Sequence, residues 1–498
     1  MQLYIGADLG TSALKLLLVD ESGTVLASVS ESYDVYFPAP GWSEQHPADW
    51  WQAFKNGVAR LTVGVDVSAI RGIGVGGQMH GLVALDETDA VIRPAILWND
   101  GRTAPQTDWL NEEVGRDVLT ARTANVAFAG FTAPKLLWMR ENEPQNFQKI
   151  RKIMLPKDYL NFLLTGVYAT EYSDAAGMLL LDVEHRCWSR EMLDVCGITE
   201  AQMPQLFESF APIGKLLPAV AAELGLPADV TVVAGAGDNA AAAVGTGTVD
   251  EGSCNLSVGT SGTLFVSATH FASGGGDALH AFCHANGGWH LMGVVLSAAS
   301  CNKWFCEEIL KTSDYAEEQQ EITPAQLGRN HVFFLPYLMG ERSVINDTDA
   351  RGMFIGMRMD TPRAAMVQAV LEGVAFALRD NLEAARAAGI TVTESTLCGG
   401  GARSPLWQTI LANVLGLTLH LPAVEEGPGY GAAMLAMVGC GAYADVSACA
   451  RTLVKHRATI TPDPVLTARY EAQYQTFKGL YPAVKDLYKT LKEDTCHE

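Results

Sequence analysis

The sequence predicts an α/β protein made of two related domains. Its 498 residues exceed what one hydrophobic core organises. Strand-like apolar runs alternate with segments of helical periodicity in both halves. In addition, residues 255–264 repeat the pattern of residues 7–13: a strand meets a Gly-Thr-Ser turn and a second strand leaves it. The repeat distance, roughly 250 residues, is about half the chain, which indicates duplication. We therefore expect domains at 1–245 and 246–498.

The N-terminal half opens with a predicted β-meander. Apolar runs bounded by Gly, Asp and Ser predict strands at 3–8, 13–19 and 24–30. Helical periodicity follows, and a glycine-rich apolar strand comes after it. The further elements expected here are a helix at 48–61, a strand at 70–75, hairpin-like strands at 82–85 and 95–98, a mainly helical stretch at 104–228, a strand at 230–234 and a helix at 239–244.

The C-terminal half alternates strand and helix after its own Gly-Thr-Ser turn. We expect strands at 289–296 and 394–397 and helices at 363–388, 404–415 and 466–491. The last helix carries an apolar stripe, which should pack on its own domain, although a homodimer contact stays open. The stripe consists of Tyr470, Tyr474, Phe477, Tyr481, Val484 and Tyr488.

Charge and composition indicate which partners the protein can bind and where it resides. A net charge of −21 argues against a nucleic-acid partner. No apolar run is long enough to span a bilayer, and the first residues lack a signal-peptide pattern. The ten cysteines show no metal-binding spacing, so we expect a reduced, cytoplasmic protein with no membrane partner. Any phosphate must then be held by backbone N–H groups, helix N-termini and a metal ion.

Three glycine-rich turns supply such groups. Gly10, Thr11 and Ser12 form the first turn and Gly259 and Thr260 the second; both offer free backbone amides and hydroxyls. The third turn ends a strand and opens a helix, where the helix dipole favours anions. Its candidate residues are Gly400, Gly401 and Ser404. One such loop alone is usually only a turn, but three at corresponding strand ends predict a polyphosphate site.

Two aspartates have a chemical task at these loops. Asp8 stands beside the first phosphate turn, where a carboxylate requires a cation such as Mg²⁺ between it and the ligand. Asp238 follows an apolar strand and begins a helix, so it could serve as a general base for a hydroxyl that attacks a phosphorus. The alternatives are an Asx turn for Asp8 and a helix cap for Asp238.

Dinucleotide binding is the main rival. Residues 72–77 have fingerprint spacing, but no helix is expected after them. Residues 235–240 lie between a strand and a helix, yet Asp238 would occupy the pyrophosphate position. Gly214 and Lys215 are followed by Leu216, so no P-loop is present. A dehydrogenase is thus a poor fit.

Longer segments of the chain resemble the FGGY carbohydrate kinases over nearly its whole length. Residues 130–142 are similar to the first family signature, and residues 352–372 are similar to the second. The second departs at Ala365, where the pattern expects a polar or acidic residue. The resemblance implies two ribonuclease-H-like domains of the actin and hexokinase superfamily, with a central cleft.

The resemblance also implies roles for single residues. The loop at 77–81, with the segments 98–102, 155–159 and 335–342, is similar to that of family members that phosphorylate xylulose. It implies that Met79, His80, Asp238 and Asn239 contact the sugar, that Asp238 is the base, and that Asp8 serves Mg²⁺ and the phosphates of ATP. The expected reaction is the phosphorylation of a ketopentose such as D-xylulose. A kinase for another ketose or polyol, or an ATPase of the same superfamily without a sugar substrate, remains as an alternative.

Overall fold

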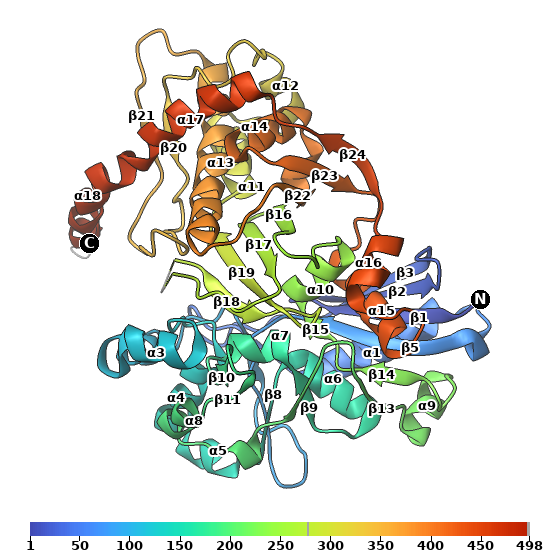
Figure 1. Ribbon diagram of the computed structural model, residues 1–498. Helices are drawn as coiled ribbons and strands as arrows, with labels where there is room; N and C mark the ends of the chain where they lie inside the picture. The colour runs from blue at the N-terminus through green and yellow to red at the C-terminus, as the bar shows by residue number, and fades with distance from the viewer. Residues whose placement is uncertain (276–277, 496–498) are drawn as a thin grey trace.

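The structure, a computed structural model, describes residues 1–275 and 278–495 and contains two seven-stranded sheets. In Figure 1 the first sheet and its helices fill the lower part of the picture, and the second sheet with its helices fills the upper part. The fold is the two-domain α/β fold that the sequence predicts.

The N-terminal sheet has the strand order β13-β14-β5-β1-β2-β3, with the short β15 also paired to β5. Strands β1, β2 and β3 form the expected antiparallel meander, and β1 and β14 both run parallel to β5. The bounds are β1 (Leu3–Leu9), β2 (Ala13–Asp20), β3 (Val25–Ser32), β5 (Ile70–Gly77), β13 (Pro212–Lys215), β14 (Thr231–Val233) and β15 (Ala236–Gly237).

The C-terminal sheet has the order β18-β19-β17-β16-β22-β23-β24. Its bounds are β16 (Cys254–Val258), β17 (Gly262–Ala268), β18 (His280–Cys283), β19 (Trp289–Val295), β22 (Glu394–Cys398), β23 (Thr418–Pro422) and β24 (His456–Ile460). Strands β16, β17 and β19 are antiparallel in sequence, whereas β22 is parallel to both β16 and β23. Six strands match in order and direction: β24-β23-β22-β16-β17-β19 corresponds to β13-β14-β5-β1-β2-β3, whereas β18 and β15 have no counterpart. The repeat in the sequence therefore reflects a repeated six-stranded sheet.

Two helices join the sheets. Helix α10 (Asp238–Gly245) leads out of the first sheet, and α15 (Gly427–Gly439), although it belongs to the C-terminal half, packs on β1, β5 and α10. Figure 1 shows α15 beside β1 and β5. A Cβ on Gly6 would lie 2.0 Å from Gly429 O, and one on Gly74 would lie 2.1 Å from Ala432 O. The glycines of β5, which imitate a dinucleotide fingerprint, thus allow a helix backbone to approach the sheet.

The other helices lie mostly where periodicity places them. Those of the N-terminal half are α1 (Pro47–Leu61), α2 (Ala104–Trp109), α3 (Arg116–Thr123), α4 (Thr132–Asn142), α5 (Pro144–Lys149), α6 (Pro156–Thr165), α7 (Tyr172–Ala175), α8 (Arg190–Cys196) and α9 (Pro218–Leu224). Those of the C-terminal half are α11 (Ala299–Trp304), α12 (Tyr315–Gln319), α13 (Arg363–Ala387), α14 (Pro405–Leu415), α16 (Val446–Leu453), α17 (Pro464–Lys478) and α18 (Leu480–Thr495).

Short strand pairs complete both halves. They are β4 (Glu44–Gln45) with β7 (Ala95–Ile96), β6 (Val83–Leu85) with β8 (Lys152–Met154), β9 (Ala169–Glu171) with β12 (Gln205–Phe207), β10 (Leu181–Asp182) with β11 (Cys187–Trp188), and β20 (Phe333–Leu335) with β21 (Met353–Ile355). The predicted hairpin of 82–85 with 95–98 is therefore wrong except for one bridge between Leu82 and Ile96. Strand β6 pairs with β8 and β7 pairs with β4, and no local sequence pattern predicts pairing between strands that lie so far apart in the chain.

The predicted final helix is two helices, because the chain bends at Gly479 between α17 and α18. Tyr470, Tyr474, Phe477 and Tyr488 are all buried within the chain, so the apolar stripe packs on its own domain as expected. Cys301 and Cys306 are buried free thiols. Within residues 1–275 and 278–495, no helix is both long and apolar enough to cross a membrane.

Candidate active site

Asp8 and Asp238 meet at one edge of the N-terminal sheet. Asp8 pairs with Gly76 of β5, and Gly237, just before Asp238, pairs with Gly77 at the end of the same strand. Strands β1, β5 and β15 are parallel, so their carboxyl ends open at the same edge. That edge is where open α/β sheets bind ligands.

Each of these carboxyl groups has a raised pKa. Burial raises the pKa of Asp8 to about 7, and the charge of Asp238 adds to the rise, whereas Lys15 lowers it and Glu426 raises it. Burial also raises the pKa of Asp238 to about 6. A carboxyl group tuned to this range can accept a proton near neutral pH.

Asp238 is held from one side only. Its Oδ1 accepts hydrogen bonds from the backbone N of Asn239 at 2.7 Å and from Asn239 Nδ2 at 3.0 Å. Among the described residues, no donor reaches Oδ2. The amide contacts orient the carboxylate at the start of α10 and leave Oδ2 open to a hydrogen-bond donor.

The two carboxylates fit a hydrated Mg²⁺ ion. No group of three or more His, Cys, Asp or Glu side chains in the described part of the chain is arranged to hold a metal by itself. Mg²⁺ usually keeps several waters and takes only one or two protein carboxylates beside the phosphates of its nucleotide. Asp8, whose pKa is raised by the negative charge of Asp238, is the carboxylate that a cation would stabilise most.

Met79 and His80 form a wall beside Asp238. A Cβ on Gly237 would lie 3.0 Å from Met79 Cγ, so the Met79 side chain covers the strand that ends at Asp238. On its other side, Met79 approaches Gly177, where an added Cβ would lie 3.0 Å from Met79 Cε. The His80 ring lies 2.7 Å from the Gly177 carbonyl oxygen through Nδ1. The sequence-predicted sugar residues Met79, His80, Asp238 and Asn239 therefore lie in one neighbourhood.

The hydrogen bond of His80 fixes its chemistry. A carbonyl oxygen only accepts, so Nδ1 carries the proton and donates to Gly177. Burial, with the charge of Lys135 second, lowers the pKa of His80 to about 3, so the ring is neutral. Its Nε2 is therefore an acceptor, suited to a hydroxyl group.

The backbone of His80 is strained and tightly held. Its φ of 69° lies in the left-handed region, which costs free energy for a residue other than glycine. The His80 carbonyl accepts from Lys135 Nζ at 2.8 Å and from Thr132 Oγ1 at 3.1 Å. Lys135 Nζ also donates to Gly130 O at 2.7 Å. These contacts offset the strain and aim the imidazole.

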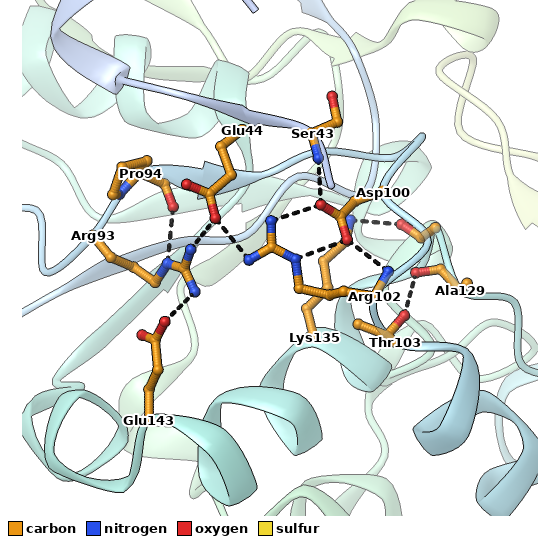
Figure 2. A network of polar contacts seen from close by, with 11 residues as sticks. Ser43, Glu44, Arg93, Pro94, Asp100, Arg102, Thr103, Ala129, Lys135 and Glu143 are labelled. Carbon is orange, nitrogen blue, oxygen red and sulfur yellow. Dashed lines mark hydrogen bonds and ion pairs between the residues drawn. The ribbon is translucent and has the colours of Figure 1, made fainter. Parts of the chain in front are cut away.

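An ion-pair network lies behind Lys135 (Figure 2). Arg102 binds Asp100 through two nitrogens at 2.8 and 2.7 Å and Glu44 at 2.7 Å. Arg93 bridges Glu44 to Glu143. Glu44, Asp100 and Arg102 are buried, so their charges interact strongly and hold the segment around Asp100 in one arrangement, whereas Arg93 and Glu143 are partly exposed.

A second buried network supports Asp238. Lys157 Nζ contacts Asp158 Oδ1 at 2.6 Å and Glu171 and Asp174 at 3.4 Å each. Glu171 accepts from Ser173 Oγ, and that hydroxyl accepts from the backbone N of Gly237 at 3.1 Å. The network thus reaches the residue directly before Asp238.

The first Gly-Thr-Ser turn is fixed from behind. Gly10 N donates to Ala13 O at 3.0 Å, which closes the turn between β1 and β2. Trp98 Nε1 donates to Thr11 Oγ1 at 3.0 Å, and Gln45 Nε2 donates to Thr11 O at 2.6 Å. The side chain of Ser12 is exposed. The turn lies directly after Asp8, as the sequence predicts.

The corresponding turns of the second sheet lie side by side. Gly259 N donates to Ser261 O at 3.0 Å, and Thr260 is exposed. Gly399 has a φ of 86°, and a Cβ there would lie 2.7 Å from the carbonyl carbon of Val258, so this turn abuts the first. Gly400 is exposed and Gly401 is buried in the same turn.

Ser404 has a different local role from the glycines. Its Oγ accepts from Trp407 N at 3.1 Å as the cap of α14 and donates to Gln319 at 2.6 Å. Its hydroxyl is therefore already engaged, and it acts first on the helix N-terminus.

Lys135 and the Lys157 network are the features that reading the sequence missed. Both lysines lie in segments that resemble family motifs, Lys135 in 130–142 and Lys157 in 155–159, but no local pattern marks them as buried. A charged residue inside an apolar helix face was the one available signal, since buried lysines require partners.

The duplicated sheets, with carboxylates at one edge and glycine turns at the strand ends, form a two-domain α/β fold of the actin and hexokinase type. The chain belongs to the FGGY family of carbohydrate kinases. The N-terminal domain model of that family matches residues 3–245, and the C-terminal domain model matches residues 254–440.

Curated relatives and solved structures agree with this family. The chain is 42% identical to the xylulose kinase of Escherichia coli K12 over 481 residues, covering 96% of this chain and 98% of the relative. It is 38% identical to the xylulose kinase of Bacillus subtilis 168, with 99% of each chain covered. The crystal structure of a xyloylose kinase from Brucella ovis superposes with a TM-score of 0.93 at 43% identity, covering 98% of this chain and 100% of that one. A gluconate kinase from Lactobacillus acidophilus gives 0.92 at 25% identity, with coverage of 98% and 99%.

Proposed function

We propose that this kinase transfers the γ-phosphoryl group of ATP to the terminal O5 hydroxyl of D-xylulose. The relatives with 38–42% identity over nearly the whole chain are xylulose kinases. A sugar hydroxyl can donate a hydrogen bond to the neutral ring of His80, and the C–H face of the sugar can pack against the apolar side chain of Met79. Gluconate and other ketoses are the competing substrates within the family.

The observation that carries the mechanism is Asp238, whose Oδ2 receives no hydrogen bond from any described residue and whose pKa is raised to about 6 by burial. In the proposed step, the sugar O5 attacks the γ-phosphorus, its proton passes to Asp238, and the bond from phosphorus to the ADP oxygen breaks. Asn239 keeps the carboxylate oriented through both of its donors.

Mg²⁺, when bound with ATP, would neutralise charge on the phosphates. Asp8 is the residue proposed to hold it, directly or through water. Removal of the repulsion between Asp8 and Asp238 would also help Asp238 to remain ionised in the loaded enzyme.

The nucleotide is proposed to lie against the glycine turns. Gly10, Thr11 and Ser12 contribute from the first sheet, and Gly259, Thr260, Gly400 and Gly401 from the second, with Ser404 acting through the N-terminus of α14. Sugar then binds mainly to residues 1–245 and ATP mainly to residues 246–498, and closure of a central cleft excludes water. Buried free thiols favour a reducing compartment, so the cytoplasm is the proposed location. Light scattering would test whether the chain forms a homodimer.

The experiment is ADP release with MgATP against a sugar panel. The panel holds D-xylulose, D-ribulose, L-ribulose, L-xylulose, fructose, gluconate and glycerol. We expect D-xylulose to give the highest kcat/KM and Asp238→Asn to abolish most turnover. A different preferred sugar would overturn the substrate while leaving the base intact, and sugar-independent ADP release would support an ATPase.

A further inference from the structure

A charged side chain of the C-terminal half, that of Arg342, lies near the loop at residues 77–81, here called the sugar loop. Arg342 lies in a loop that its neighbours fasten to the end of β19. Glu341 Oε1 accepts from Leu296 N at 3.0 Å, and Ser343 Oγ accepts from Val294 N at 2.8 Å. The backbone on both sides of Arg342 is therefore fixed to the second sheet.

The guanidinium of Arg342 lacks a polar partner within the part of the chain that the structure describes. Among the described residues, it makes no ion pair and no hydrogen bond, although the side chain is partly buried and burial lowers its pKa. Its contact is the ring of Phe128, 4.9 Å from the guanidinium carbon. Arginine carries five N–H donors, and removing them from water without acceptors is costly. Such a group is suited to a ligand that supplies oxygen acceptors.

A chain of aromatic contacts links Arg342 to His80. Phe128 lies 5.6 Å from Phe131, and Phe131 lies 4.7 Å from the imidazole of His80. The charge of Arg342 lowers the pKa of His80 and of His280, the ring that stands 5.0 Å from Phe128. The charges that act on Asp8 are instead those of Asp238, Lys15 and Glu426. Arg342 thus lies at the His80 end of the site.

The two groups at this end have opposite polarity. His80 Nε2 only accepts, because Nδ1 donates to Gly177, whereas Arg342 only donates. An α-hydroxy ketone offers the matching pair: a hydroxyl that donates to His80 and a carbonyl oxygen that accepts from Arg342. We propose that Arg342 binds the carbonyl end of the sugar, opposite the hydroxyl that faces Asp238, and selects ketoses over polyols. This inference rests on the proposed function.

The test compares a ketose with the polyols made by reducing its carbonyl. We would measure kcat and KM of Arg342→Met and Arg342→Lys for D-xylulose, xylitol and D-arabinitol, and the binding of D-xylulose by calorimetry without ATP. Methionine keeps an apolar stem over Phe128 but removes the donors. Arg329→Met, at an exposed arginine away from the site, is the matched control.

We expect Arg342→Met to weaken D-xylulose binding and kcat/KM by about 10- to 100-fold, mainly through KM, and to change kcat/KM for the pentitols less than about threefold. Arg342→Lys should lie between. An equal loss for ketose and polyol, no loss at all, or a rise confined to the KM for ATP would overturn the proposal. If the unmodified chain prefers another ketose, that sugar and its polyols enter the same comparison, so the substrate assignment and the role of Arg342 fail separately.

Discussion

The two sheets share the order of six strands, but they differ at the edge where the Gly-Thr-Ser turns lie: in the first sheet that edge carries Asp8 and Asp238. Register places Asp8 of β1 where β16 has Ser257, since both residues stand two positions before the glycine of their turn. Asp238 is the first residue of α10, which follows β15, and Glu426 directly precedes α15, the helix after β23. Glu426 is paired with Lys15, whereas the donors that reach Asp238 from the described residues are the backbone N and Nδ2 of Asn239. The two domains thus share a sheet architecture, but the carboxylate at the start of the helix is ion-paired in one (Glu426) and receives amide hydrogen bonds in the other (Asp238).

The sheets also differ in how they meet the helices between them. Gly6 and Gly74 let the backbone of α15 touch the first sheet. The equivalent residues of the second sheet are Asn255 and Thr396, which hydrogen-bond Thr246 at the end of α10 at 3.0 and 3.1 Å. One contact is close backbone packing and the other is polar. Equivalent positions of the two sheets therefore contact the intervening helices through two different interactions, backbone packing in one and side-chain hydrogen bonds in the other.

The largest expected effect is a difference in kcat between substitutions of Asp238 and of Glu426, the carboxylates at the starts of α10 and α15. Asp238→Asn should lower kcat by about 10³-fold or more, because the base is lost while shape is kept. Glu426→Gln, at the paired position, should lower it by less than about tenfold. Steady-state ADP release measures both. Equal losses would mean that the charge of the whole edge, and not one base, supports turnover.

The next effect concerns packing of the sheets. Gly74→Ala would place a Cβ 2.1 Å from the Ala432 carbonyl, so we expect a loss of about 3 kcal/mol in stability. Thr396→Ala removes one buried hydrogen bond and should cost about 1 kcal/mol. Thermal unfolding compares them. A mild Gly74→Ala would show that α15 can shift and that the contact is not rigid.

The pH dependence tests the acidic edge. Asp238 must be ionised to accept a proton, and its pKa is raised to about 6 beside Asp8 at about 7. We expect kcat/KM to fall about tenfold per pH unit below this range and to level off above it. Asp8→Asn removes a neighbouring charge and should move the Asp238 limb to lower pH. A profile flat down to pH 5 would contradict the assignment of the base.

The smallest effect is on stability. A carboxyl whose pKa is raised by folding binds its proton more tightly in the folded state. Its contribution to stability is therefore lost as pH rises from the unfolded pKa, roughly 4, through the folded pKa of about 6, and the full loss is present above that. Asp238→Asn should therefore stabilise the protein at pH 8 by on the order of 1 kcal/mol and give no gain near pH 4. Glu426→Gln should give no gain, since its charge is paired. Melting curves at both pH values distinguish these outcomes.

The sequence predicted many of the strands and helices correctly. The meander, the strand before Asp238 and the long helix at 363–387 lie close to their predicted bounds, because apolar periodicity and turn residues act locally. The partners of β6 and β7 and the break at Gly479 were not readable, since pairing and bending depend on distant contacts.

The sequence by itself determined the class of the protein: a duplicated α/β chain with glycine turns after strands, acidic residues beside them, and segments that resemble one kinase family. Only the tertiary structure decided what those residues face. It holds His80 in a strained backbone conformation through Lys135 and pairs Glu426 with Lys15. It also places Arg342 of the second half against Phe128, with no ion pair to Arg342 or Asp238 from the residues described. The physical reason is that a motif fixes residue type and local geometry, whereas ionisation and hydrogen-bond polarity depend on neighbours that lie far away in the chain.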